Sequence, residues 1–269
     1  MRRLLRWIAT ALGLTLLIAL LVGGGLVFWL GRDLPDLSKL DGLRLLASGA
    51  TGPMSLESLP IMSKTEHRDS PVRLDQIAPL TVKVIVSSED RRFYSHPGFD
   101  LIGLGRAMLE SANGNRQGGS TITAQLVRST LIAPDPSIER KVREAILSVQ
   151  LEQRFSKDEI LSGYLNTVYW GGDSAGIHAA SRAYFGIEPS QLSLAQGTYL
   201  AALLPGPNTR LADLRLARTD MRSRLERLMD DGEIDRAQLE TAWRERLVPV
   251  GWFARYDTKG NLLEARRTR

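Results

Sequence analysis

The chain opens with a run of apolar positions that no charged residue interrupts between Trp7 and Gly31. At about 1.5 Å per helical residue this run reaches roughly 37 Å, enough to cross a hydrocarbon core of about 30 Å. Arg2, Arg3 and Arg6 precede it, and the positive-inside rule places such residues in the cytoplasm. The pattern predicts an uncleaved single-pass transmembrane helix, with the rest of the chain outside. A cleaved signal peptide is the alternative, but its apolar region is normally only about 7–15 residues long.

The alternation of polar and apolar positions divides the rest of the chain into three parts. Residues 32–75 contain scattered prolines and glycines and predict a juxtamembrane connector with little regular structure, apart from a candidate strand around Leu59–Met62. Residues 76–250 combine apolar periodicity with helix start signals and predict one mainly α-helical domain. Residues 251–269 predict a C-terminal tail with a frayed polar end. With residues 1–31 as cytoplasmic stub and anchor, the chain has four parts.

Start and stop signals locate several helices inside the domain. Ser156 and Glu159 form a capping box before an apolar-periodic segment, and Asp135 with Pro136 predicts the N-cap and first turn of another helix. Periodicity predicts helices through residues 140–155, 192–204, 214–230 and 235–245. The last two carry arginines on their outer faces, which we expect to be solvated surface. By propensity alone, the β-branched residues of Thr81–Val86 favour a strand.

Composition narrows the functional classes only a little. The 269 residues include 35 Lys and Arg against 30 Asp and Glu, which gives a net charge of +5 and a pI near 9.7. This excess is compatible with nucleic acid, anionic lipid or a phosphorylated substrate. Basic and aromatic residues are not interleaved and no zinc-type spacing occurs, so no nucleic-acid partner is expected. The sequence has no cysteine, which excludes disulfides, thiolate metal sites and a cysteine nucleophile.

Three segments concentrate the residues that could carry chemistry. Glu89–Asp100 begins with two carboxylates and continues into an aromatic residue, a histidine and a Pro-Gly turn. Gly118–Gln125 is rich in Gly, Ser and Thr, and Arg140–Glu144 contains three cations and another carboxylate. Cations at a helix start, aided by the helix dipole, can hold a pyrophosphate. Together these are the parts needed to break a phosphate ester of a sugar.

Each segment also has a purely structural explanation. Glu89 and Asp90 could cap a helix or pair with neighbouring arginines, and Arg140 with Glu144 could form an i, i+4 surface pair worth a few tenths of a kcal/mol. On a helical wheel, the face expected to be core is made of Val142, Ala145, Ile146 and Val149. Glu144 lies on the opposite face, which apolar residues continue. A partly buried site, where charges need a ligand, is therefore indicated.

These segments, together with Lys157–Gly171, stand in the order and spacing of the motifs of the family-51 peptidoglycan glycosyltransferases, which the chain resembles over about residues 75–245. The resemblance implies a lysozyme-like helical domain behind a transmembrane anchor. It also implies an enzyme that polymerises lipid II into β-1,4 glycan strands, releases undecaprenyl pyrophosphate and inverts the anomeric carbon. No Ser-x-x-Lys motif occurs in the sequence, so transpeptidase activity is not expected.

The resemblance assigns roles to individual residues. Glu89 is similar to the general base that deprotonates the acceptor hydroxyl. Glu144 is similar to the second carboxylate, which would assist departure of the pyrophosphate directly or through a metal ion. The residues expected to bind substrate are Asp90, Ser120, Thr121, Gln125, Arg128, Arg140, Lys141 and Arg143. The motif residues expected to hold the cleft together are Phe93, His96, Lys157, Tyr164 and Asn166.

The chain departs from the family pattern at three places. Ala124 stands where a first glutamine is usual, Arg128 where lysine is usual, and Gln196-Gly197 where the family tends to have Glu-Ala. Arg128 keeps the positive charge but replaces a point charge by a forked donor. A glycine inside a helix costs up to about 1 kcal/mol. None of these changes removes a carboxylate.

The resemblance also implies the surroundings of the enzyme. No cofactor is obligatory, although a divalent cation such as Mg²⁺ or Mn²⁺ could bind at Glu144. Expected partners are lipid II, the growing lipid-linked strand, membrane lipid and cell-wall elongation or division proteins, at the outer side of the inner (cytoplasmic) membrane. Two alternatives stay open. A lytic transglycosylase or muramidase would need no cationic pyrophosphate site, and a non-catalytic membrane-anchored scaffold would tolerate loss of Glu89 or Glu144.

Overall fold

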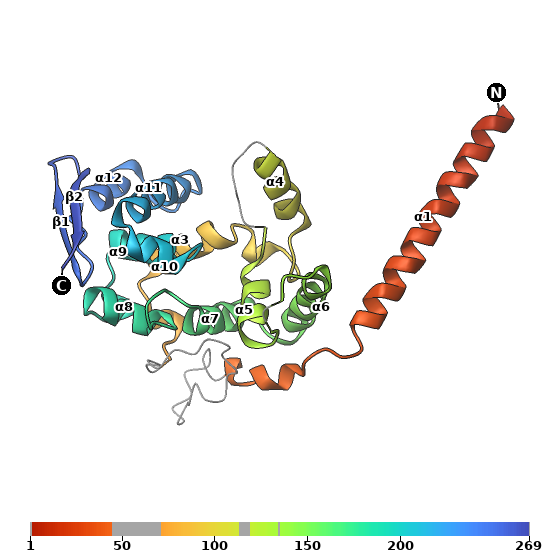
Figure 1. The fold of residues 1–269 in the computed structure, drawn as a ribbon, viewed down its shortest axis with the longest axis horizontal. Coiled ribbons are helices and arrows are strands. Elements are labelled where there is room, and N and C mark those ends of the chain that lie inside the picture. The colour runs from red at the N-terminus through yellow and green to blue at the C-terminus, as the bar shows by residue number, and fades with distance from the viewer. Residues whose placement is uncertain (1, 45–70, 113–118, 134, 269) are drawn as a thin grey trace.

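The computed structural model describes residues 2–44, 71–112, 119–133 and 135–268. The candidate strand at Leu59–Met62 lies outside these residues, as does Gly118 at the start of the Gly/Ser/Thr segment. Within the described residues the chain is mainly helical, with one short two-stranded sheet (Figure 1). The mainly α fold class is therefore confirmed.

The N-terminal helix α1 (Arg2–Leu30) has 29 residues and extends away from the helical body (Figure 1). It contacts α6 (Ile138–Arg154). Within the described part of the chain, no helix combines the length and the hydropathy that a membrane span needs. The transmembrane anchor at residues 1–31 therefore stays a prediction.

The described part of the connector is more ordered than the sequence predicts. Leu37–Leu40 form a 3-10 helix capped by Asp36, and Leu40 and Leu43 are completely buried in the main core. A Cβ on Gly163 would lie only 2.3 Å from Cδ2 of Leu43, so glycine at this position leaves room for the leucine. Burial of apolar side chains stabilises the fold, and the leucines of this segment dock for that reason despite the neighbouring prolines and glycines.

One group of helices is built on α3 (Pro79–Glu89), which packs against α9 (Leu194–Leu203) and α11 (Leu214–Asp230). The same group also contains α8 (Ile177–Phe185), α10 (Pro207–Ala212), α12 (Arg236–Arg244), and the 3-10 helices η3 (Leu74–Gln76) and η5 (Pro189–Gln191). The helices predicted at 192–204, 214–230 and 235–245 are thus confirmed as α9, α11 and α12.

The contact between α3 and α9 settles the conformation of Thr81–Val86, which is helical and not a strand. Pro79 occupies the first helical position, and Thr81, Val84 and Ile85 are buried at helical spacing. Packing on α9 therefore overrides the β propensity of these residues. A Cβ on Gly197 of α9 would lie 2.2 Å from Oγ1 of Thr81. Glycine at this unusual position allows the two helices to approach closely.

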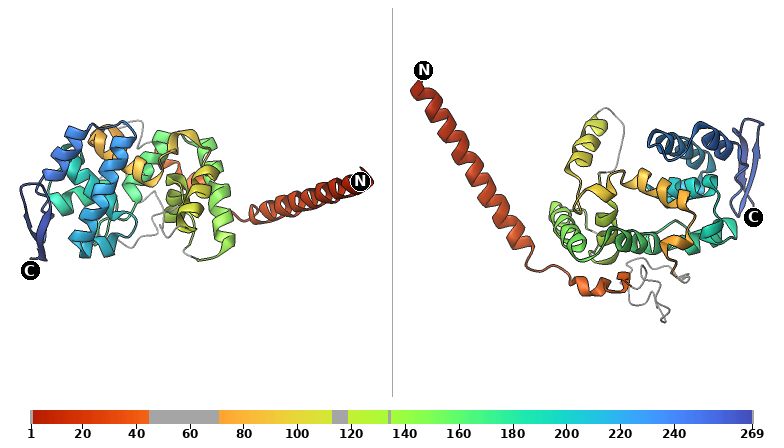
Figure 2. Two further views of the ribbon diagram at one scale, coloured as in Figure 1. Left: turned by 90° about the horizontal axis from the view of Figure 1, so that it is seen from above. Right: turned by 180° about the vertical axis from the view of Figure 1, so that it is seen from behind.

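A second group contains α4 (Leu101–Ala112), α5 (Ile122–Thr130), α6 and α7 (Lys157–Thr167), with the 3-10 helix η4 (Phe93–Ser95) before it. Helix α5 packs against α6 and α7, and the capping box of Ser156 and Glu159 at the start of α7 is confirmed. The views of Figures 1 and 2 agree that α4 and α11 stand on opposite sides of the end of α3.

Helix α6 differs from its prediction in two ways. Its N-cap is Ser137, whose Oγ accepts the N–H of Arg140 at 3.1 Å, and Asp135 instead accepts a hydrogen bond from Ser137. Its buried residues are Glu144, Leu147, Ser148 and Leu151, whereas the face expected to be core is only half-buried. The leucines join the core residues Leu126 and Val127 of α5, so packing on α5 selects the face that carries Glu144.

The C-terminal residues are not a frayed tail. Strand β1 (Trp252–Tyr256) pairs antiparallel with β2 (Leu262–Arg267). Arg215 of α11 donates to the backbone carbonyls of Leu262 and Leu263 at 3.3 and 2.8 Å, which fastens the hairpin to the helical body. The apolar residues on this segment explain the difference, because Trp252 and Tyr256 are buried.

Candidate active site

A cavity of about 700 Å³ lies where α3 ends, between the two groups of helices. Its walls come from α3 and the turn after it, α4, the start of α5, α10 and α11. The polar and charged residues that line it include Glu89, Asp90, Ser120, Thr121, Gln125, Arg128, Arg210, Arg224 and Arg227. All except the last three are predicted site residues. The structure thus gathers most of the predicted site around Glu89.

Glu89 is the last residue of α3 and receives a hydrogen bond from a neutral amide. Nε2 of Gln125 donates to Oε2 of Glu89 at 3.1 Å. Burial raises the pKa of the Glu89 carboxyl, while the Gln125 hydrogen bond and more distant arginines, Arg224 first, act in the opposite direction. A carboxylate whose pKa is raised in this way is a stronger base at neutral pH than a solvated one.

Tyr164 supports Gln125 from α7. The Tyr164 hydroxyl donates to Oε1 of Gln125 at 3.2 Å, so the amide is oriented with its NH₂ group toward Glu89. Burial, followed by the charge of Glu89, raises the pKa of Tyr164 well above its ordinary value. The phenol therefore stays protonated and keeps its donor role.

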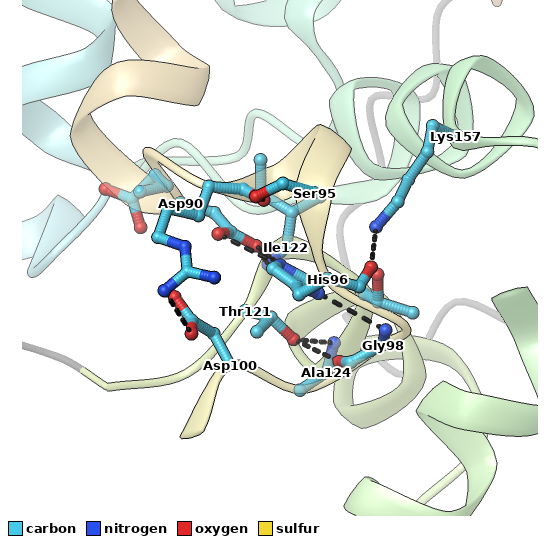
Figure 3. A network of polar contacts seen from close by, with 12 residues as sticks. Asp90, Ser95, His96, Gly98, Asp100, Thr121, Ile122, Ala124 and Lys157 are labelled. Atoms are coloured by element: carbon cyan, nitrogen blue, oxygen red, sulfur yellow. Dashed lines mark hydrogen bonds and ion pairs between the residues drawn. The ribbon is translucent and has the colours of Figure 1, made fainter. Parts of the chain in front are cut away.

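Asp90 is buried and fully engaged by its neighbours (Figure 3). Its Oδ2 accepts the backbone N–H of Ile122 at 3.0 Å and lies 2.9 Å from Nε2 of His96. Nδ1 of His96 accepts the N–H of Gly98 at 3.2 Å, so a neutral imidazole carries its proton on Nε2 and donates it to Asp90. Asp90 thereby ties the end of α3 to the start of α5 and fixes the position of the adjacent Glu89.

Lys157 joins this network from α7 (Figure 3). Its Nζ donates to the backbone carbonyl of His96 at 2.7 Å and pairs with Glu152 at 2.7 Å. The same ammonium lies 4.5 Å from the ring centroid of Phe93, which is completely buried. These contacts hold the turn after α3 against α6 and α7.

The side chains of Thr121 and Asn166 form hydrogen bonds with backbone groups of distant segments. Thr121 caps α5 by accepting the N–H of Ala124 at 3.1 Å, and its hydroxyl donates to the carbonyl of Gly98 at 2.7 Å (Figure 3). Asn166 accepts the N–H of Val72 at 2.9 Å and donates to its carbonyl at 2.8 Å. Both side chains are buried, so they position the chain around the cavity.

Glu144 lies outside the cavity lining, with 2% of its side chain exposed. Arg140 donates to its Oε1, and Nζ of Lys141 lies 3.1 Å from its Oε2. Lys141 also reaches Oγ of Ser120, a cavity residue, at 3.4 Å. The Arg140–Glu144 pair is therefore buried at its acidic end, not a surface pair, and it adjoins the cavity at Ser120.

The structure does not bring Arg143 together with these residues. Arg143 pairs with Glu139 at 2.9 Å and donates to the carbonyl of Asp33 at 3.4 Å. Its guanidinium thus faces the segment after α1. Arg128, by contrast, lines the cavity.

Sequence interpretation missed the cationic wall formed by Arg210, Arg224 and Arg227, here called the α10–α11 arginines. The sequence predicts solvated arginines on the outer face of α11, yet Arg224 and Arg227 are half-buried and line the cavity. They follow Asp220 at i+4 and i+7, beside a buried stripe of Met221, Leu225 and Leu228. The sequence contains this polar stripe at the same helical spacing as the core stripe, and it is the one feature that could have indicated that these arginines share an environment.

The surroundings of Glu144 do not fit the divalent cation that the resemblance implies. Magnesium and manganese take oxygen ligands, whereas both carboxylate oxygens of Glu144 contact the cations of Arg140 and Lys141. Among the described residues, no three or more His, Cys, Asp or Glu side chains gather into a set of metal ligands.

A carboxylate with a raised pKa in a cavity lined by arginines is typical of an enzyme whose substrate carries an anionic group. The particular family follows from comparison with known proteins. A family model described as Transglycosylase matches residues 57–231, and the chain belongs to this family.

Several penicillin-binding proteins are similar to this chain. Penicillin-binding protein 1A of Escherichia coli (strain K12) is 36% identical over 242 residues, which cover 85% of this chain and 28% of that protein. Penicillin-binding protein 1F of Bacillus subtilis (strain 168) is 40% identical over 147 residues, 54% of this chain and 20% of that protein. The crystal structure of penicillin-binding protein 1A from Haemophilus influenzae matches 70% of this chain and 19% of its own, with a TM-score of 0.42 and 20% identity. The chain therefore spans less than a third of the length of these relatives.

Proposed function

We propose that the protein is a peptidoglycan glycosyltransferase that polymerises lipid II into β-1,4 glycan strands. The supporting observation is the position of Glu89, a carboxylate with a raised pKa that lies in a cavity lined by arginines. The reaction joins the 4-hydroxyl of an acceptor GlcNAc to C1 of a donor MurNAc. Undecaprenyl pyrophosphate leaves and the anomeric carbon inverts.

Glu89 is the general base in this proposal. Its carboxylate takes the proton of the acceptor hydroxyl as the oxygen attacks C1, and the bond from C1 to the pyrophosphate oxygen breaks with its electron pair. A positioned base contributes about 10²- to 10⁴-fold. Gln125 and Tyr164 hold the carboxylate in place through the hydrogen bonds described above.

The cations near α5 and α6 stabilise the departing pyrophosphate. Arg128 lines the cavity, and Lys141 reaches its edge at Ser120. Fixed cations lower the energy of developing negative charge without reorganising during the reaction. Glu144 holds Arg140 and Lys141 in position, so it assists the leaving group through these two residues. Asp90 and Thr121 act as positioning residues, since protein atoms occupy their polar groups.

The protein is proposed to work at the outer side of the inner membrane, with α1 as a single-pass anchor and the N-terminus in the cytoplasm. The uncharged run between Trp7 and Gly31 and the arginines before it support this topology. Lipid II, the growing strand and membrane lipid are the proposed partners, together with proteins of cell-wall elongation or division.

A gel assay of lipid II with the full chain in detergent tests the proposal. Wild-type protein should form long glycan strands, and Glu89→Gln, which keeps the side-chain shape, should lower the rate by at least about 10². Polymerisation by Glu89→Gln at nearly the wild-type rate would exclude Glu89 as the base. Soluble fragments released from finished peptidoglycan would instead favour a lytic enzyme, and no reaction of either kind would favour a scaffold.

A further inference from the structure

Arg224 lies in the cavity wall, and its guanidinium has a buried hydrogen-bond donor without a partner among the described residues. Its Nη1 donates to the backbone carbonyl of Asp220 at 3.2 Å, within its own helix. Its buried Nε finds no hydrogen-bond partner among the residues that the structure describes. Burial lowers the pKa of Arg224, with the charge of Glu89 acting in the opposite direction. Such a guanidinium gains stability when an anion binds to it, because charge-assisted hydrogen bonds replace the lost hydration.

Neighbouring acids do not neutralise this part of the wall. Asp220 is paired with Arg210, and Asp231 is paired with Arg91. For Arg224 and Arg227, the described part of the chain provides no carboxylate within 4.0 Å. The cavity therefore carries two arginines that have no ion pair among the described residues and can bind the anionic group of a ligand.

The α10–α11 arginines lie apart from the cations assigned to the leaving pyrophosphate. Arg128 belongs to α5 and Lys141 to α6, in one group of helices, whereas α10 and α11 belong to the other group. The end of α3, which carries Glu89, lies between α5 and α11 (Figures 1 and 2). The proposed base thus has cationic groups on two sides.

We infer that Arg224 and Arg227, the two α10–α11 arginines without an ion pair among the described residues, bind an oxyanion of the acceptor substrate, and this inference rests on the proposed function. A transfer between two lipid-linked sugars requires the site to hold two anionic molecules at once. The leaving pyrophosphate belongs to the donor and is served by the α5–α6 side. The hydroxyl that Glu89 deprotonates belongs to the acceptor, so cations on the opposite side of Glu89 meet the acceptor's pyrophosphate or the carboxylates of its peptide.

Two-substrate kinetics with the full chain test this inference. Lipid II with a capped 4-hydroxyl can act only as donor, and lipid II with a phosphonate carbon in place of the anomeric oxygen can act only as acceptor. In Arg224→Gln we expect the KM for the acceptor to rise about tenfold or more, as for loss of a charge-assisted hydrogen bond, and the KM for the donor to change less than about twofold. Arg128→Gln should show the reverse pattern.

Arg222→Gln is the matched control on the same helix. Arg222 pairs with Glu226 at 2.8 Å and Glu240 at 3.4 Å and is not among the cavity residues, so both KM values should stay at the wild-type level. Arg224→Lys should recover part of the acceptor affinity because it keeps the charge. If thermal unfolding shows that Arg224→Gln does not fold, Arg227→Gln takes its place under the same criterion.

A peptide-free acceptor separates the two sources of the oxyanion. If the KM increase persists with this acceptor, the arginines bind its pyrophosphate, and if it disappears, they bind the peptide carboxylates. An unchanged acceptor KM in a folded variant, or an increase in the donor KM alone, overturns the inference while wild-type coupling still supports the proposed function. Failure of the wild-type protein to couple the two analogues overturns both.

Discussion

Glu89 and Glu144 are a half-buried and a fully buried carboxylate, and their surroundings differ. Glu89 faces the cavity and receives a hydrogen bond from the neutral amide of Gln125. Glu144 lies outside the lining and is held between Arg140 and Lys141. A carboxylate without an ion pair binds a proton readily, which suits transfer of a proton. A carboxylate paired with two cations suits the placement of those cations.

Unfolding measurements on Glu144→Gln and Glu89→Gln should separate the two carboxylates most clearly. Glu144→Gln removes the charge between two cations, and we expect the free energy of unfolding at pH 7 to fall by about 2 kcal/mol, less than for a fully buried pair because Lys141 is 51% exposed. Glu89→Gln loses no ion pair and replaces a poorly solvated charge by a neutral group, so the free energy of unfolding should stay equal or rise. Urea denaturation checks both values, and equal losses would contradict the comparison.

The pH dependence of the rate gives a second test. The base must be ionised to accept a proton, and burial raises the pKa of Glu89. The value of kcat/KM should therefore fall on the acid side, with a midpoint at a pH above the ordinary glutamate pKa of about 4.3. Gln125→Leu removes a hydrogen bond that lowers this pKa, and it should move the acid limb to higher pH. Tyr164→Phe leaves Gln125 in place and should give a smaller shift in the same direction. A limb that moves to lower pH would contradict this role of Gln125.

The raised pKa also sets the sign of a stability effect. The folded protein holds the Glu89 proton more tightly than the unfolded chain, so stability decreases as pH rises from the unfolded pKa through the folded pKa. Above that window the cost of the buried charge is constant. The stability gained by Glu89→Gln relative to wild type should therefore grow across this window, which urea denaturation at several pH values would show.

The sequence predicts the helical class, the capping box at Ser156 and most of the residues around Glu89, because these depend on local signals and on ordered motifs. It does not predict which face of α6 is buried, since apolar residues occur on both faces and only contact with α5 decides between them. The docking of Leu43 on Gly163 likewise depends on two segments far apart in the chain.

The α10–α11 arginines were missed for a related reason. A polar stripe on an amphipathic helix is usually solvated, so the stripe that contains Arg224 does not by itself distinguish a cavity wall from an exposed surface. Its environment is set by the packing of α11 on α3 and α9. Long-range packing therefore assigns these residues to the site, whereas the motifs around Glu89 are visible in the sequence.

The smallest expected loss of polymerisation rate is that of an Arg143 variant, and Lys141 on the same helix, α6, provides the comparison. Arg143 faces Glu139 and the carbonyl of Asp33, both away from the cavity, so Arg143→Ala should change the polymerisation rate less than about twofold. It should cost about 1 kcal/mol of stability, the upper end for surface ion pairs, because Arg143 is half-buried and Glu139 is exposed. Lys141→Ala removes the cation that joins Glu144 to Ser120 and should lower the rate about tenfold. Equal rate losses in the two variants would mean that charge anywhere along the start of α6 serves the reaction, and that the placement of Lys141 by Glu144 does not matter.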